Sequence, residues 1–135
     1  RQDIILETYS KTINIEALTA SDMVKRDILP AVSAYVSELS NGVLTKKSIS
    51  EDIPCKAELD IIKRLSGLQD CAYEKLSTLD NAVIGVREAG DDPAYYKDAV
   101  IPAMNELRAV VDEMETLVSS EYWPYPTYAD LMYRV

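Results

Sequence analysis

Apolar residues recur at steps of three and four along long stretches of this chain, and this period constrains the fold most. One buried face of an α-helix requires this spacing. The stretch over about 92–119 alternates steps of four and three throughout, which is the 3.5-residue repeat of helices that pack nearly antiparallel with a slight left-handed twist. The stripe of the middle stretch, about 54–89, is Ile62, Leu65, Leu68, Ala72, Leu76, Leu79, Val83 and Val86. That of the third stretch is Tyr96, Val100, Ala103, Leu107, Val110, Met114 and Leu117. The first stretch, about 3–40, carries Ile5, Tyr9, Ile13, Met23, Val24, Ile28, Val32, Tyr35 and Leu39.

Local signals set the expected ends of these helices. Asn41-Gly42 suits the left-handed residue that ends many helices, so the first helix is predicted to stop at Ser40. Pro54 fits the first turn of the second helix, and Gly90 its end. Asp92-Pro93 places a capping acid before a proline, which is a strong start signal. We therefore predict an all-α fold for one domain, residues 1–135: an up-down-up bundle of three long helices at about 3–40, 54–89 and 92–119, with a tail over 121–135.

Two prolines fall inside the predicted helices. Pro30 and Pro102 each lack an amide donor and crowd the carbonyl four residues earlier. We expect bends or short interruptions there. A bundle that curves around its core explains them more simply than a functional hinge.

The tail over 121–135 is the one stretch with a competing functional interpretation. It holds the chain's single tryptophan, four of its nine tyrosines and two prolines. Such a segment is too apolar to stay solvated, and its prolines interrupt any long helix. It is expected to dock, either over this bundle or on another domain or subunit, and to end in a short helix. The candidate docking residues are Trp123, Pro124, Tyr125, Tyr128 and Leu131.

The composition argues against several kinds of chemistry. There is no histidine, so neither a phosphorelay nor a ferritin-like di-iron site is expected, and serine or cysteine catalysis lacks its usual base. Cys55 and Cys71 are too far apart on one helix for a disulfide and are expected to be reduced. Acidic side chains such as Glu106 and Glu113 look like a solvated helix face. We predict no catalytic, cofactor-binding or metal-binding residue.

The net charge and the hydropathy of the chain limit the kinds of partner that we expect. The net charge of −9 makes nucleic acid or an anionic membrane an unexpected partner. No apolar stretch approaches the ~20 residues of a membrane span. The chain opens without a methionine, so we expect it to be a piece of a longer protein.

Several blocks of sequence resemble one enzyme family, the type III glutamine synthetases, in their C-terminal segment. The resemblance covers nearly all of the chain, and its most specific blocks are the third and fourth. The blocks are Tyr9-Ser-Lys-Thr-Ile-Asn-Ile-Glu16; Asp27-Ile-Leu-Pro-Ala31 with Tyr35; Tyr95-Tyr-Lys-Asp-Ala-Val-Ile-Pro-Ala-Met104 with Leu107-Arg108 and Val111-Asp112-Glu113; and Trp123-Pro-Tyr-Pro-Thr-Tyr-Ala-Asp-Leu131.

The resemblance implies a parent enzyme that makes glutamine from glutamate, ammonia and ATP with Mg²⁺ or Mn²⁺, in the cytoplasm. It also implies a large ring assembly, thought to be two stacked hexamers. The family's metal-binding and phosphate-binding motifs are not matched here, so no catalytic residue carries over. The expected partners are the catalytic domain of the same chain and neighbouring subunits of the homo-oligomer. The first hypothesis is therefore a structural, oligomer-supporting domain. The second is a regulatory or partner-binding module of the same enzyme, and the weakest is a free-standing carboxylate metal bundle.

Overall fold

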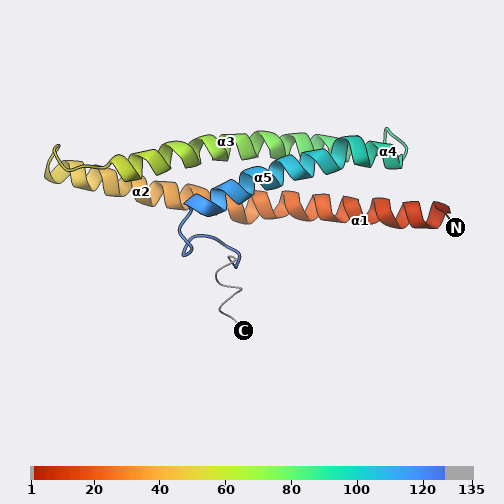
Figure 1. Cartoon of the computed structure of the whole chain (residues 1–135), viewed down its shortest axis with the longest axis horizontal. Coiled ribbons are helices and arrows are strands. Elements are labelled where there is room, and N and C mark those ends of the chain that lie inside the picture. The colour runs from red at the N-terminus through yellow and green to blue at the C-terminus, as the bar shows by residue number, and fades with distance from the viewer. Residues whose placement is uncertain (1, 127–135) are drawn as a thin grey trace.

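Three helical arms make up the fold, and the chain reverses direction between them (Figure 1). The computed structural model describes residues 2–126, and within that range it contains helices and turns but no strand. The prediction of an all-α bundle of three long helices is confirmed.

The first arm is one long rod formed by three consecutive elements. These are α1 (Gln2–Met23), the π-helical turn η1 (Val24–Ile28) and α2 (Leu29–Ile49). The predicted stop at Asn41-Gly42 is wrong. Gly42 does not take the positive φ of a helix-ending glycine, which among the glycines of residues 2–126 only Gly90 adopts. Beyond it the rod packs along the second arm, where Lys46 pairs with Glu58. Such contacts outweigh the ~1 kcal/mol that a glycine costs inside a helix.

The second arm is α3 (Lys56–Ile84), which ends five residues before its predicted limit of 89. The chain turns instead through Gly90 and Asp91, whose φ angles are 66° and 57°. Tyr95 fixes this turn, because its hydroxyl donates to the carbonyl of Ala82 at 2.6 Å. The packing of the Tyr95 ring therefore sets the end of α3. The local sequence around Ile84 gives no sign of this contact, because Tyr95 lies eleven residues further along the chain.

The third arm comprises α4 (Pro93–Tyr95), the π-helical turn η2 (Tyr96–Val100) and α5 (Ile101–Leu117). Its predicted start is confirmed. Asp92 is the N-cap, and its carboxylate accepts a hydrogen bond from the amide of Ala94 at 3.0 Å. The arm ends at Leu117, close to the predicted 119.

A π-helical turn precedes each internal proline. The amide of Leu29 donates to the carbonyl of Val24, and the amide of Ile101 donates to that of Tyr96. Each bond reaches back five residues instead of four, as in a π-bulge. The widened turn gives room to the proline ring, which would otherwise press on the carbonyl four residues earlier. The interruptions expected near Pro30 and Pro102 are present in this form.

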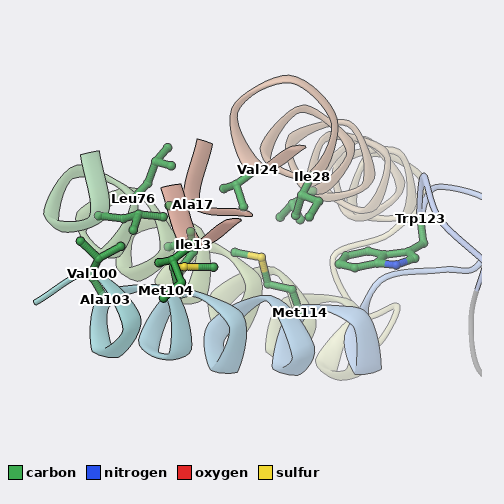
Figure 2. Close-up of a cluster of buried hydrophobic side chains, with 14 of the residues drawn as sticks. Ile13, Ala17, Val24, Ile28, Leu76, Val100, Ala103, Met104, Met114 and Trp123 are labelled. Atoms are coloured by element: carbon green, nitrogen blue, oxygen red, sulfur yellow. The ribbon is translucent and has the colours of Figure 1, made fainter. Parts of the chain in front are cut away.

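The core lies where the three arms meet (Figure 2). The predicted stripes of the second and third arms are buried or half-buried throughout, so the helical period identified them correctly. In the first arm Tyr9 is an exception at 46% exposure. It borders a groove between α1 and α5 that no described side chain fills. The fully buried large side chains are Leu65, Leu79, Leu107, Met114, Val32 and Val100.

Candidate functional site

The segment after α5 folds back on the first arm as a tight turn. The amides of Tyr122 and Trp123 both donate to the carbonyl of Ser119, at 2.9 and 3.1 Å. The hydroxyl of Ser119 also accepts from the amide of Glu121 at 3.3 Å. This local turn reverses the chain, so that residues 122–126, which we call the docked segment, face the bundle.

Trp123 is the deepest part of the docked segment. Its side chain is 8% exposed and belongs to the same apolar cluster as the three arms. In Figure 2 the indole lies beside Ile28 of the first arm and Met114 of the third. The residue therefore extends the apolar core shared by the arms with a side chain from the segment after α5.

Tyr122 packs on α2 beside Trp123. Its ring centroid lies 5.3 Å from that of Tyr35, and the ring planes are tilted by 49°. Such tilted aromatic pairs contribute beyond their buried area. Hydrogen bonding to Glu38, and then burial, raise the pKa of Tyr122 above its ordinary value.

Tyr125 fastens the segment to the π-helical turn of the first arm. Its hydroxyl donates to Oδ2 of Asp27 at 2.5 Å. Burial, followed by this hydrogen bond to the carboxylate, raises the pKa of Tyr125 to about 12. The phenol therefore stays protonated, and able to donate, well above neutral pH.

The remaining predicted docking residues divide into two groups. Pro124 is exposed, so it shapes the turn between its aromatic neighbours without being covered. Tyr128 and Leu131, and the short terminal helix predicted around them, lie outside the described residues. Sequence reasoning did not identify Asp27, Tyr35 or Glu38 as partners of the tail. A contact between a hydroxyl and a carboxylate 98 residues apart leaves no local pattern.

A polar link ties the first and second arms together near the same level of the bundle. Asp80 accepts a hydrogen bond from the hydroxyl of Ser21 at 2.7 Å, and it forms an ion pair with Lys25 at 2.8 Å. Ser21 is 4% exposed, so its hydroxyl depends on this partner. One carboxylate thus serves both a buried donor and a surface cation.

Few groups suited to chemistry come together in the part of the chain that the structure describes. Over residues 2–126 no three His, Cys, Asp or Glu side chains converge as metal ligands would. Cys55 and Cys71 are both free thiols. Glu106 forms an ion pair with Lys75 at 3.6 Å, and Glu113 is exposed. No helix within that range has the length and apolar character to cross a membrane.

Comparison with known proteins gives a consistent result. Residues 1–47 match the family described as the glutamine synthetase C-terminal domain. The whole chain is 36% identical to a glutamine synthetase of Butyrivibrio fibrisolvens, of which it covers 20%. It is 29% identical to the type-3 glutamine synthetase of Dictyostelium discoideum over 98% of the chain and 19% of that protein. A glutamine synthetase of Bacteroides fragilis (strain YCH46) is 24% identical over the same shares. No solved structure matches the chain.

The fold and the docked segment define a helical bundle domain that holds its own C-terminal aromatic segment. The predicted resemblance is confirmed: residues 1–47 are similar to the glutamine synthetase C-terminal domain, and 98% of the chain is similar to a type-3 glutamine synthetase. It spans about one fifth of the length of the curated relatives it matches.

Proposed function

We propose that this chain is the non-catalytic C-terminal domain of a type III glutamine synthetase. The whole enzyme would be a glutamate–ammonia ligase that consumes ATP with Mg²⁺ or Mn²⁺, serving glutamine biosynthesis and nitrogen assimilation in the cytoplasm. The domain's own role would be structural. It would pack on the catalytic domain of the same chain and support a ring-shaped homo-oligomer, with neither nucleic acid nor membrane as a partner.

The observation that carries this proposal is the use of the aromatic tail. The three aromatic side chains of this segment all contact the bundle. Trp123 is buried in the apolar core, Tyr122 packs against Tyr35, and Tyr125 donates a hydrogen bond to Asp27. A segment used in this way stiffens a scaffold. The carboxylate of Asp27, next to this segment, accepts the hydrogen bond of the Tyr125 hydroxyl.

A surface for the rest of the enzyme is available on α1. Ile15 and Leu18 lie one turn apart and are 64% and 53% exposed. Residues three apart share a helix face, and paired exposed apolar side chains favour contact with another protein surface. They point away from the groove that Tyr9 borders, since they occupy a different face of the helix.

The test uses the full-length enzyme. Replacing Ile15 and Leu18 together by glutamate should break the ring into smaller species in light scattering, while ATP affinity stays unchanged. Thr19→Glu, a matched change at an exposed polar position of the same turn, should leave the ring intact. A full-size ring that has lost ATP or glutamate binding would refute the structural role.

The regulatory or partner-binding alternative needs an apolar cleft with converging polar groups. The two cavities between α1 and α5 measure about 170 and 260 Å³, below the ~300 Å³ at which small-molecule sites begin. A hollow of about 910 Å³ lies against the first turns of α3 alone, lined by residues between Lys56 and Lys63. The structural role is therefore the better supported. Calorimetric heat from glutamine or ATP titrated into the isolated chain would reverse this order.

A further inference from the structure

The first arm and α3 lie side by side as a layer of two helices (Figure 1). Three side-chain contacts fix their antiparallel alignment: Ser21 with Asp80, Ser33 with Gln69, and Lys46 with Glu58. The third arm packs on one side of this layer. We call the opposite side, which faces away from α5, the open face.

The phase of α3 shows which of its side chains belong to the open face. Lys75 lies on the side of the third arm, since it pairs with Glu106 of α5 at 3.6 Å. Each residue advances ~100° around a helix, so Leu59, Tyr73 and Ile84 lie ~160–180° away from Lys75. These three side chains therefore point away from α5.

The first arm adds two leucines to the open face. Glu16 lines the groove against α5, and Tyr35 packs on Tyr122, which follows α5. By the same rotation, Leu18 lies ~160° from Glu16, and Leu44 lies ~180° from Tyr35. Both leucines thus face the same way as the three residues of α3.

Apolar surface gathers on the open face. Its five apolar side chains are 40–70% exposed, and they make up five of the eight large apolar side chains that are exposed among the described residues. Single exposed apolar residues are common on proteins, but a shared face is typical of an interaction site.

The order of residues along α3 is self-complementary. In a two-fold interface, if one residue meets another across the axis, the reverse contact also forms. When α3 packs antiparallel on α3 of a second copy, with the axis between residues 71 and 72, Leu59 meets Ile84 at both ends. Ser66 then meets Ser77, and both are small and exposed, so the helices can approach closely.

The first arm satisfies the same axis. The contacts between the two arms set Leu18 level with Ile84, and Leu44 level with Leu59. Because the axis brings Ile84 to Leu59 of the second copy, it also brings Leu18 to Leu44. Four of the five exposed apolar residues are thereby paired with another apolar residue.

The charges of α3 also suit this register. Between residues 59 and 84 it sets only one pair of charged residues level with each other, Lys63 and Asp80, and their signs are opposite. The third arm differs, because α5 carries four acidic residues and one basic residue. In a chain with a net charge of −9, two α5 surfaces would repel, whereas two open faces would not.

The open face has the size of a stable interface. From Leu59 to Ile84 it extends ~38 Å along α3, and two adjacent helices present a width of ~20 Å. The resulting area is ~760 Å², close to the ~800 Å² that each partner buries in a typical stable complex.

We propose that two copies of this chain associate through their open faces, around a two-fold axis that crosses α3 between residues 71 and 72. Leu59 of each copy contacts Ile84 of the other, and Leu18 contacts Leu44. Tyr73, next to the axis, packs against α3 of the second copy. The association depends on concentration, so dilute protein, as used in unfolding experiments, is monomeric and exposes Tyr73. This inference goes beyond the proposed structural role, because it names a partner and a surface.

Sedimentation velocity of the 135-residue chain over a range of concentrations tests the proposal. The mass should rise from 15.1 kDa to twice that value as the concentration increases. Leu59→Glu combined with Ile84→Glu sets like charges opposite each other at both ends, and should weaken the dimer at least ~10-fold. Leu59→Glu combined with Ile84→Lys sets opposite charges there and should retain the dimer. Parallel helices would give the reverse order, because like charges would then meet in the second variant.

The control is Ala109→Glu combined with Thr116→Glu, which adds the same two charges at exposed positions of α5. This variant should dimerise like the unaltered chain. All four substituted positions are exposed, so each variant should keep its helical content in circular dichroism.

A chain that stays monomeric at every concentration would overturn the proposal. A dimer that survives Leu59→Glu with Ile84→Glu would also overturn it, as would equal weakening by the two double variants of α3 or by the α5 control. The mass of the 135-residue chain depends on neither ring assembly nor ligase activity. A negative result here therefore leaves the proposed function untouched, since that function is tested by the size of the full enzyme's ring.

Discussion

Tyr125 donates its hydroxyl hydrogen bond to Asp27 at 2.5 Å, across 98 residues of sequence. Asp27 lies inside the π-helical turn that precedes Pro30. The C-terminal segment is thus fastened to the one place in the first arm where regular α-helical bonding is interrupted. The contact connects the segment after α5 to the middle of the rod formed by α1, η1 and α2.

The Tyr125→Phe variant tests this contact through pH. The folded-state pKa of Tyr125, about 12, exceeds its ordinary value of 10.0. A group whose pKa is raised by folding stabilises the fold below the unfolded-state pKa, and this contribution is lost as pH rises through the folded-state value. The free energy of unfolding should therefore fall between pH ~10 and ~12, and Tyr125→Phe should remove part of that fall.

Near neutral pH the Tyr125→Phe variant should lose about 1 kcal/mol of unfolding free energy, the usual net value of one hydrogen bond. Urea unfolding at several pH values measures both. Identical pH profiles for the two proteins would show that the contact does not persist in solution.

Trp123→Ala should destabilise the domain strongly. Truncating a buried tryptophan costs about 3 kcal/mol or more, since the transfer term and the resulting cavity add. Tyr73, which is 64% exposed, provides the control: Tyr73→Ala should change stability by less than ~0.5 kcal/mol. Urea unfolding monitored by circular dichroism compares them, because the tryptophan signal is lost in the variant. In the full enzyme Trp123→Ala should weaken ring assembly more than it alters metal or ATP affinity. If Trp123→Ala and Tyr73→Ala lost equally little unfolding free energy, the docked segment would not be part of the cooperative fold.

Gly85 and Gly67 should respond in opposite ways to alanine. A Cβ at Gly85 would collide with the hydroxyl of Tyr95, whereas a Cβ at Gly67 meets nothing within 4 Å. Gly85→Ala should therefore cost ~1–3 kcal/mol, as overpacking does. Gly67→Ala should stabilise by ~0.5–1 kcal/mol, because alanine suits a helix interior better than glycine. Thermal unfolding of the two variants measures both signs. Two stabilised variants would indicate that Tyr95 does not hold the turn after α3.

The hydrogen bond between Asp80 and Ser21 should contribute more to the stability of the fold than the ion pair between Asp80 and Lys25. Asp80→Ala leaves the buried hydroxyl of Ser21 without its acceptor, at a cost of ~1–3 kcal/mol. Asp80→Asn retains an acceptor and loses only the half-exposed ion pair, so it should cost less than ~1 kcal/mol. Asp60→Ala, which breaks the exposed pair with Arg64, is the control and should be nearly neutral. Chemical denaturation of the three variants gives the order. If Asp80→Asn proved as unstable as Asp80→Ala, the loss of stability would come from the lost ion pair with Lys25 and not from the lost hydrogen bond to Ser21.

The parts of the fold that sequence predicted well are those with a local cause. The stripe from Ile62 to Val86 and the cap at Asp92 were correct because spacing and capping are properties of short segments. The stop at Asn41-Gly42 was wrong because the extension to Ile49 depends on packing along α3. The end of α3 was likewise decided by Tyr95, eleven residues further on.

At the candidate site, too, sequence predicted the features with a local cause and missed those that depend on distant contacts. Composition alone predicted that Trp123 and Tyr125 must dock, since aromatic side chains at this density are not left in water. It did not indicate the surface, because neither cis nor trans docking leaves a mark on the sequence of the tail. Tyr9 was placed on the buried face by its period, yet it lies at the rim of an open groove. Helical spacing identifies the face of a helix, but not what covers it.

The two π-helical turns affect which changes of length the chain can tolerate. Each accommodates one residue more than an ordinary turn, and one residue corresponds to ~100° of rotation about the helix axis. Val24, Ile28 and Val32 are all buried, so the rod keeps one inward face across this turn. Deleting a single residue inside the turn would restore ordinary α-helical bonding and keep the distal half of the rod in phase with α3, whereas the same deletion within α2 would rotate everything beyond it by ~100°.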